Sequence, residues 1–239
     1  MRLDFTVYVP PLRFQPLLKQ LAFDLVPPPA PTLDNFVIGS NAELVQRLRT
    51  LGASAGAERA IYIWGPPGSG RTHLLRGAVA DLDARGLRTA YCGGSAGLAT
   101  AAPDTIQAAA VDDVETLDES GAAALFRLYN AIRERGGVFL AAGTAPPARL
   151  RLRADVVTRL GWGLVFELHP LTDSDKEQAL SEHAAARGFS LTPEVARYLL
   201  ARSQRDMGNL IATVDALDRY SMETKRAVTV PLLRELLES

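Results

Sequence analysis

The sequence predicts an α/β fold, in which helices flank a parallel sheet, followed by a smaller helical domain. An apolar run at residues 61–64 leads through a glycine-rich turn into leucines at helical spacing, which is typical of a strand, a loop and a helix. Further short apolar runs alternate with helical patterns as far as residue 170, and beyond it the pattern is helical throughout. We expect an extended arm over residues 1–31, an α/β base over residues 32–170 and a helical lid over residues 171–239.

The composition limits the classes of protein to consider. With 239 residues and 47% hydrophobic content, the chain can bury the core of one large or two small domains. A formal net charge of −1 gives no general electrostatic reason for autonomous binding to nucleic acid. The single cysteine, Cys92, excludes an internal disulfide, and no apolar run reaches the roughly 18 residues of a membrane span. Asp4 and several prolines interrupt the start of the chain where a signal peptide is apolar, so we expect a cytoplasmic protein.

The arm contains a short peptide that is suited to docking. Prolines at residues 27–29 and 31 favour an extended, semi-rigid linker. The hexapeptide before them, residues 20–25, places a glutamine, a leucine, an aromatic residue and a final leucine where another protein's apolar pocket could receive them. An equal alternative is that this segment packs on its own domain. The candidate partner-binding residues are Gln20, Leu21, Phe23 and Leu25.

A helix is expected before the first strand. Ser40 and Glu43 have the spacing of a capping box, and Gly52 suits the end of the helix. The leucines that share one helical face between them are Leu44, Leu48 and Leu51.

The turn after the first strand fits the phosphate-loop pattern G-x-x-x-x-G-[K]-[ST]. In this pattern, backbone N–H groups and a helix N-terminus surround a phosphate, and the glycines permit the tight curvature. Thr72 offers its hydroxyl to Mg²⁺, whereas Arg71 replaces the usual Lys with a planar cation of a different shape. The alternative is an ordinary Gly/Pro turn. The candidate nucleotide-binding residues are Gly65, Pro66, Pro67, Gly68, Ser69, Gly70, Arg71, Thr72 and His73.

Two further strands are expected at residues 87–91 and 106–111, while residues 93–105 are rich in Gly, Ala, Ser and Thr and give no periodic pattern. The second of these strands delivers Asp112 and Asp113 at its end. An apolar strand that ends in Asp provides a carboxylate for Mg²⁺ opposite a phosphate loop, and a neighbouring acid can orient a water molecule. We assign Asp112 to the metal and Asp113 to the water. The alternative is a solvated acidic cap.

Two more candidate residues follow. A strand at residues 138–142 ends beside Thr144, and ligands collect at the carboxyl ends of strands in open α/β sheets. An equally good interpretation is that Thr144 is a polar residue that caps a turn and has no contact with a ligand. Several arginines lie close together in the segment that follows, and a row of arginines usually forms a solvated surface. Arg159 differs from the others, because it lies in a short apolar helix just before a strand at residues 164–168.

The remaining chain predicts a helical lid. One helix runs from Asp173 to Arg187 and ends at Gly188, and a second opens at residues 192–194 with a cap residue and Pro in its first turn. A third helix carries Arg205 at its start.

This ordered series of motifs resembles the AAA+ ATPases, and among them the DnaA initiator and the short Hda-type regulators of DnaA. The resemblance implies an AAA+ P-loop NTPase base, with residues 65–72 as the Walker A loop and residues 111–114 as the Walker B motif. It further implies sensor 1 at Thr144, the arginine finger at Arg159 and the nucleotide-binding sensor 2 at Arg205.

Three features are similar to Hda-type regulators rather than to DnaA. The chain ends at Ser239, soon after the lid, without the helix-turn-helix domain into which DnaA continues. The hexapeptide at residues 20–25 resembles the peptide with which Hda-type proteins bind the sliding clamp, the beta subunit of DNA polymerase III. Asp24 departs from that pattern, because the family often has Pro there. Arg71 in place of Lys is also similar to the Hda type.

The resemblance implies a negative regulator of replication initiation. Such a protein docks on the sliding clamp and supplies Arg159 in trans to ATP held by DnaA, whose hydrolysis it stimulates. Its own cofactors would be ADP or ATP with Mg²⁺, and its intrinsic ATPase activity would be weak at most because of Arg71.

Two other classes stay open. The first is an AAA+ ATPase or adaptor of the helicase-loader or DNA-remodelling type that turns over its own ATP, which Thr72, Asp112 and Asp113 would allow and Arg71 counts against. The second is a binding protein with a vestigial nucleotide pocket. The sequence also leaves open which nucleotide is resident and whether the chain forms a homo-oligomer.

Overall fold

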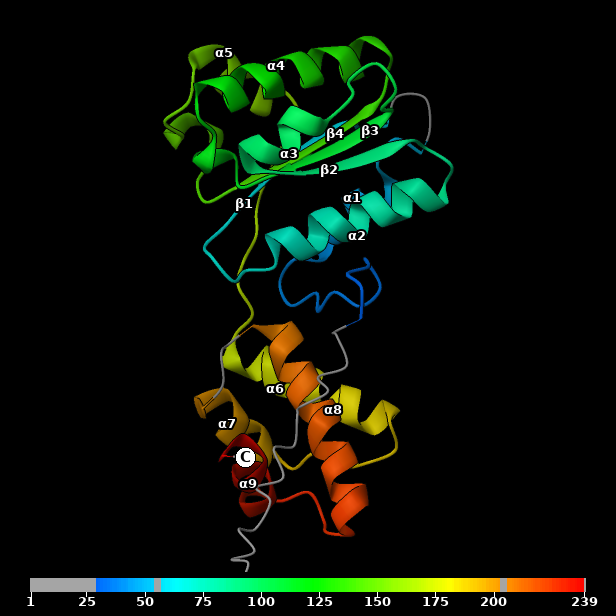
Figure 1. The fold of residues 1–239 in the computed structure, drawn as a ribbon, viewed down its shortest axis with the longest axis vertical. Helices are drawn as coiled ribbons and strands as arrows, with labels where there is room; N and C mark the ends of the chain where they lie inside the picture. Colours follow the sequence, from blue (N-terminus) through cyan, green and yellow to red (C-terminus); the bar gives the residue numbers. More distant parts are fainter. Residues whose placement is uncertain (1–28, 54–56, 203–205, 239) are drawn as a thin grey trace, which may run out of the picture.

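The computed structural model describes residues 29–53, 57–202 and 206–238 (Figure 1). The candidate docking residues Gln20, Leu21, Phe23 and Leu25 lie outside the described residues, and so does Arg205. The described part consists of an α/β base and a C-terminal group of helices, joined by an extended segment that follows the last strand (Figure 1).

The base is built on five short strands. They are β1 (Ala60–Trp64), β2 (Thr89–Gly93), β3 (Ala108–Asp112), β4 (Val138–Gly143) and β5 (Leu164–Glu167). All neighbouring pairs are parallel, in the order β2-β3-β4-β1-β5. The central strands β3 and β4 are buried along their whole length, as expected of parallel strands that are covered on both faces. The predicted parallel sheet is confirmed.

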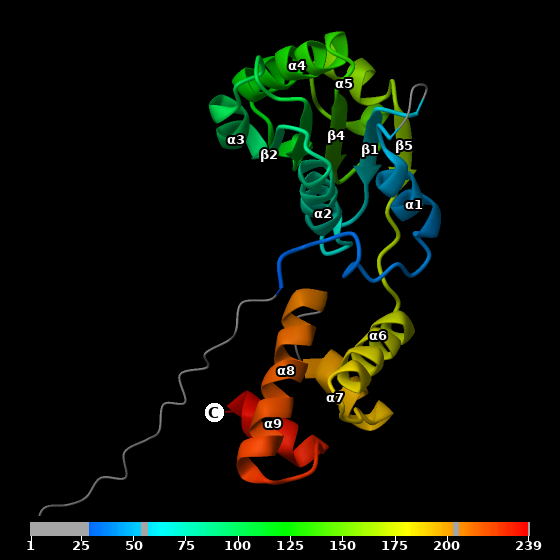
Figure 2. The same cartoon turned by 90° about the vertical axis from the view of Figure 1, so that its right-hand side faces the viewer.

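Helices cover both faces of this sheet (Figures 1 and 2). One face carries α1 (Ala42–Thr50) and α2 (Arg71–Ala84), and the other carries α3 (Gly94–Thr100), α4 (Glu119–Glu134) and α5 (Ala154–Leu160). Short 3₁₀ turns, η1 (Val114–Thr116) and η2 (Pro147–Arg149), follow β3 and β4. Because side chains alternate along a strand, Ile61 and Ile63 of β1 pack in the core beneath α1 and α2, whereas Tyr62 packs on the α4 side.

Two local features of the base differ from what the sequence indicated. The segment that gave no periodic pattern, and so no prediction, contains α3. Only Leu98 of this helix is buried, and the helix is fixed by packing on α4 and β2 rather than by an apolar stripe. The capping box of Ser40 and Glu43 does not form. The N-cap of α1 is Asn41, whose side chain makes no capping bond. It instead exchanges two hydrogen bonds of 2.9 Å with the backbone of His169, which follows β5.

The C-terminal helices form a second core. They are α6 (Asp173–Ala186), α7 (Pro193–Arg202), α8 (Met207–Thr224) and α9 (Val230–Glu238). Their buried residues form a separate hydrophobic cluster, so this helical part has its own packed interior. α6 begins with a capping box between Thr172 and Asp175, which fixes where the extended segment ends and the helix starts. Within the described residues, none of these helices or those of the base combines the length and apolar character needed to cross a bilayer.

Candidate nucleotide-binding site

The glycine-rich loop connects the end of β1 to the start of α2, as the sequence pattern predicts. Gly68 and Gly70 have φ values of 79° and 101°, a region that residues with a side chain rarely adopt. A Cβ atom on Gly65 would lie 2.6 Å from the carbonyl oxygen of Leu168. The loop can therefore follow this course only with glycine at these positions, and it leads into the N-terminus of α2, where the first N–H groups of a helix have no intrahelical partner.

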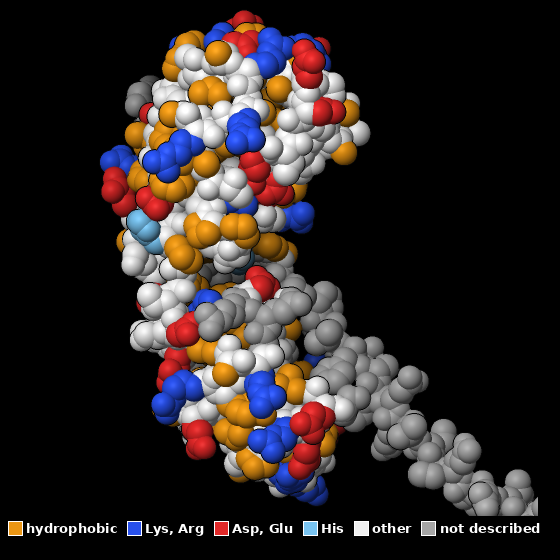
Figure 3. Space-filling view, turned by 90° about the vertical axis from the view of Figure 1, so that its left-hand side faces the viewer, with side chains coloured by type: hydrophobic (Ala, Val, Ile, Leu, Met, Phe, Trp, Pro, Cys, Tyr) orange, Lys and Arg blue, Asp and Glu red, His pale blue; other side chains and the backbone are white. Residues whose placement is uncertain are grey.

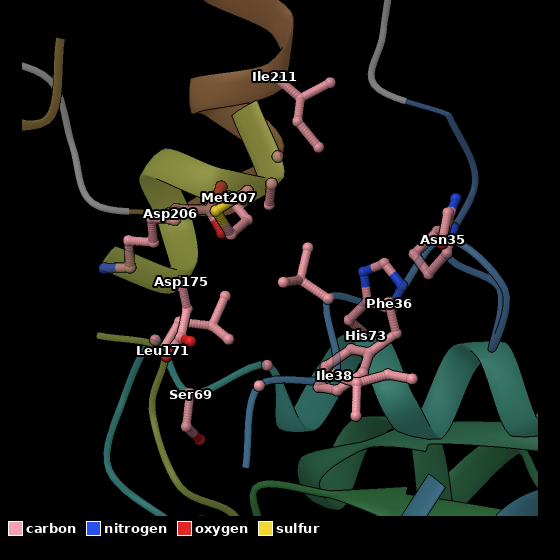
Figure 4. A pocket seen from close by; sticks show the side chains of 18 of the residues that line it. Asn35, Phe36, Ile38, Ser69, His73, Leu171, Asp175, Asp206, Met207 and Ile211 are labelled. Carbon is pink, nitrogen blue, oxygen red and sulfur yellow. The ribbon is translucent and has the colours of Figure 1, made fainter. Parts of the chain in front are cut away.

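The loop borders a cavity of about 1070 Å³ between the base and the helical part. Figure 4 shows its walls: Phe36 and Ile38 lie beside His73 of α2 on one side, and Leu171, Asp206 and Met207 lie on the other. The ring centroids of Phe36 and His73 are 5.5 Å apart. Among the predicted loop residues, those from Gly68 to His73 line the cavity, and the described residues Gly65, Pro66 and Pro67 precede the lining part.

The apolar walls of this cavity were missed by the sequence reasoning. The segment 35–38 comes from before β1, whereas Leu171, Met207 and Ile211 come from the helical part. Nothing in their local spacing marks these residues, because the fold rather than the sequence order brings them to the loop. An apolar cleft with a few convergent polar groups is the usual form of a small-molecule site.

Thr72 and Asp112 meet at the start of α2. The Thr72 hydroxyl donates a hydrogen bond of 2.6 Å to Oδ2 of Asp112, which is fully buried at the end of β3. Since β3 and β1 flank β4, parallel pairing brings the end of β3 and the phosphate loop to the same edge of the sheet. The structure thus brings the two predicted metal-binding side chains into contact.

Arg71 points toward the acidic residues that follow β3. Its Nη1 donates a hydrogen bond of 2.5 Å to the carbonyl oxygen of Gly65, and its Nη2 lies 3.5 Å from Asp113 and 3.9 Å from Glu115. Burial, together with the neighbouring charges of Asp112 and Glu115, raises the pKa of Asp113 above its ordinary value, although Arg71 opposes this shift. The loop cation is therefore already bound within the chain.

Thr144 follows β4, between the end of β3 and the phosphate loop. It is exposed, and its backbone N–H donates a hydrogen bond of 3.2 Å to Glu115. Because β4 lies between β3 and β1, Thr144 is at the same carboxyl edge as Asp112 and Thr72. This is the location expected of a polar residue near a terminal phosphate.

Arg159 is the one described candidate that the structure does not bring to this edge. It lies on α5, on the face of the sheet away from α2 and the helical part (Figures 1 and 2). Its guanidinium carbon is 4.3 Å from the ring centroid of Phe126 and 4.8 Å from that of Trp162. Its Nε is buried and has no hydrogen-bond partner among the described residues. Trp162 is half-exposed, so this aromatic pair holds Arg159 at the surface of the base.

The residues around the loop fit a magnesium nucleotide. The donor set of a hydroxyl and a carboxylate consists of hard oxygens, which Mg²⁺ prefers, and the glycine backbone leaves room for phosphate. Ser69 adds a buried hydroxyl oxygen without a hydrogen-bond partner in the described structure. Among the described residues, no group of three His, Cys, Asp or Glu side chains offers another metal site. If bound here, the cation would be held by Thr72 and Asp112 and would offset phosphate charge.

The fold is that of the AAA+ proteins, with a P-loop α/β base and a helical lid. The chain is similar in structure to domain III of DnaA from Thermotoga maritima, with a TM-score of 0.71 and 20% identity over 88% of this chain and 96% of that one. AMPPCP-bound DnaA from Aquifex aeolicus gives a TM-score of 0.68 and 22% identity over 82% and 67% of the two chains. RuvB, the Holliday junction branch migration motor of Thermotoga maritima, gives a TM-score of 0.62 and 16% identity over 90% and 72%.

A match to a family model specifies the resemblance further. Residues 173–237 match the family model of the Hda lid domain. Together with the DnaA-like fold, this match confirms the predicted resemblance to Hda-type, DnaA-homologous AAA+ proteins.

Proposed function

We propose that the chain is a negative regulator of replication initiation that stimulates hydrolysis of the ATP bound to DnaA. The Hda-type lid and the DnaA-like base support this assignment. The proposal has three parts, which are a resident nucleotide, an arginine supplied to DnaA, and a peptide that docks on the sliding clamp. The clamp-binding peptide would be residues 20–25, which precede the described chain.

The resident nucleotide would be ADP or ATP with Mg²⁺. The relatives include DnaA structures bound to AMPPCP, and the cavity here combines a phosphate loop with apolar walls. Because Arg71 is held by the Gly65 carbonyl and two acids, we expect the chain to hydrolyse bound ATP slowly. Arg205, predicted as sensor 2, would add a cation from the lid.

The position of Arg159 is the observation that carries the proposal. An arginine that acts on the nucleotide of its own chain should lie near the phosphate loop of that chain. Arg159 instead lies across the sheet from α2. Two aromatic rings hold its guanidinium without a hydrogen bond to Nε. The guanidinium of Arg159 thus lies on aromatic rings at the surface of the base, where a phosphate of another molecule could approach its terminal nitrogens. An arginine supplied in trans stabilises charge on the transferred phosphoryl group and is worth about 10³–10⁵ in rate in other systems.

The test is hydrolysis of DnaA-bound ATP in the presence of DNA-loaded clamp. We expect Arg159→Ala to abolish the stimulation, because its guanidinium is the group that acts. Arg151→Ala is the matched control, since Arg151 is exposed in the same segment and should leave stimulation unchanged. Equal stimulation by Arg159→Ala and the wild type would refute the arginine part of the proposal.

The clamp part is tested separately. Gln20→Ala and Leu21→Ala should each reduce retention on immobilised sliding clamp, because these side chains would occupy the apolar pocket of the clamp. Undiminished retention of both variants would refute the assignment of this peptide.

A second candidate is an AAA+ adaptor of the helicase-loader type that turns over its own ATP. The preformed contact between Thr72 and Asp112 favours it, because these two side chains suit a hydrolytic Mg²⁺ site. Steady-state hydrolysis by the isolated chain, without DnaA and abolished in Asp112→Ala, would favour this class over the regulator.

A further inference from the structure

The buried carboxylate of Asp112 accepts hydrogen bonds from three directions. Oδ2 accepts from the Thr72 hydroxyl at 2.6 Å and from the Tyr91 hydroxyl at 2.8 Å. Oδ1 accepts from the backbone N–H of Asp113 at 3.0 Å. Because Asp112 is fully buried, these contacts fix how its carboxylate is turned. Thr72 belongs to the predicted Walker A loop and Asp112 to the predicted Walker B motif, whereas Tyr91 belongs to neither.

Tyr91 reaches Asp112 from the neighbouring strand. β2 pairs with β3, and Tyr91 is opposite Ala110, two residues before the acid. The guanidinium carbon of Arg76 lies 4.5 Å from the centroid of the Tyr91 ring and so covers the ring on the α2 side. Burial and the hydrogen bond to Asp112 raise the pKa of the Tyr91 hydroxyl, so it stays a protonated donor at neutral pH.

The direction of the Thr72 hydrogen bond determines what its oxygen can do. A hydroxyl has one hydrogen and two lone pairs, and here the hydrogen is given to Asp112. The lone pairs are then free for a hard cation such as Mg²⁺. If the carboxylate turned, the hydroxyl would lose its acceptor and could direct its hydrogen toward the cation. The orientation of Asp112 therefore controls whether Thr72 can act as a ligand.

We propose that Tyr91 is a positioning residue of the magnesium-nucleotide site, whose hydroxyl anchors Oδ2 of Asp112 so that Thr72 keeps its lone pairs toward the cation. The torsion that turns a carboxylate is soft, and the Asp113 N–H anchors only Oδ1. Tyr91 supplies the second anchor. The inference rests on the nucleotide-binding part of the proposed function and needs neither DnaA nor the clamp.

The test compares ADP binding by the full chain with and without Mg²⁺, measured by calorimetry. Tyr91→Phe removes one hydroxyl and keeps the ring. We expect its affinity for ADP in EDTA to equal that of the wild type, while the increase in affinity on adding Mg²⁺ falls by about tenfold, since groups that orient a metal ligand typically contribute 10–100-fold.

Tyr62→Phe is the matched control. Tyr62 is a buried tyrosine of the same sheet, and its hydroxyl donates a hydrogen bond of 2.8 Å to the Ala145 carbonyl rather than to Asp112. The Mg²⁺-dependent increase should be unchanged in this variant. Equal losses in Tyr62→Phe and Tyr91→Phe would overturn the proposal, because they would reflect a general loosening of the sheet.

A double-substitution cycle adds a readout that a merely structural role would not affect. Thr72→Val removes the hydroxyl whose orientation Tyr91 is proposed to control. Adding Tyr91→Phe to this variant should therefore cause no further loss of the increase in ADP affinity on adding Mg²⁺. Additive losses would overturn the proposal, and so would a Tyr91→Phe variant that loses affinity equally with and without Mg²⁺. If the wild type itself bound no ADP, the nucleotide site would fail and the role of Tyr91 with it. Binding by the wild type and an unchanged increase in Tyr91→Phe would refute Tyr91 alone.

Discussion

Substitution of Gly77 by Ala tests whether the segment before β1 is a fixed wall of the nucleotide cavity. Gly77 is buried in α2, and a Cβ atom there would lie 2.8 Å from the carbonyl carbon of Thr32 and 2.9 Å from the nitrogen of Leu33. These are backbone atoms, so relief requires the segment itself to move. The carbonyl oxygen of Thr32 also lies 3.0 Å from Nε2 of His73, and this contact would be strained by the same movement.

Two effects oppose each other in Gly77→Ala. Alanine is better than glycine inside a helix by about 1 kcal/mol, whereas overpacking a close contact costs about 1–3 kcal/mol. The clash should win, which leaves a net loss of about 1 kcal/mol and a fall in Tm of roughly 2–4 °C. Because Phe36 belongs to the displaced segment and lines the cavity, ADP affinity should fall by roughly 2–10-fold, the worth of one aromatic contact.

Thermal unfolding and calorimetric titration with ADP measure the two outcomes. Ala80→Gly is the matched control, because Ala80 is exposed in the same helix and reports helix propensity alone. It should lose about 1 kcal/mol and leave ADP affinity unchanged. If Gly77→Ala were more stable than the wild type and bound ADP equally well, the segment would be free to shift and the reasoning would be refuted.

Three further outcomes are expected. The folded chain holds the proton of Asp113 more tightly than the unfolded chain does, so the charged form of Asp113 destabilises the fold above its folded-state pKa. Asp113→Asn removes this charge and should raise Tm by roughly 1–2 °C at neutral pH. This gain should vanish as the pH falls below the ordinary range of aspartate, and a gain that persisted in acid would contradict the argument. Asn41→Ala removes two hydrogen bonds to the backbone of His169 and should cost about 1–3 kcal/mol of unfolding free energy in urea titrations, against little change for Asn35→Ala. Leu125→Ala, at a fully buried position of α4, should lower the unfolding free energy by about 2–5 kcal/mol in the same titrations. A loss below about 1 kcal/mol would contradict this expectation, because it would mean that neighbouring side chains fill the cavity left by the leucine.

The parts of the fold that could be predicted are those whose signal is local. β1, the loop and α2 follow one another within residues 60–84, and glycine and threonine at fixed spacing mark the turn directly. β3 could be recognised because a strand covered on both faces is a continuous apolar run. Its start was expected two residues early, at Ile106, because an apolar residue beside a strand looks like part of it.

The parts that could not be predicted depend on distant contacts. The strand order comes from pairing across the chain, and the cavity needs Phe36 and Ile211 from opposite ends of it. Ser40 was expected to cap α1, because a short polar residue before a helix usually does so. The N-cap residue is Asn41 instead, and its side chain binds the backbone of His169, which is 128 residues away. Tyr91 shows the same limitation, because its hydrogen bond to Asp112 arises from the pairing of β2 with β3.

The way Arg71 is held has a consequence for the empty protein. A phosphate loop whose cation has no internal counter-charge is left with an uncompensated charge when its ligand departs, and that charge promotes prompt rebinding or local collapse. Here the carboxylates of Asp113 and Glu115 and the carbonyl of Gly65 already compensate the guanidinium. We expect the vacant form to persist long enough to exchange one nucleotide for another, so that cellular nucleotide levels rather than tight retention determine which is bound.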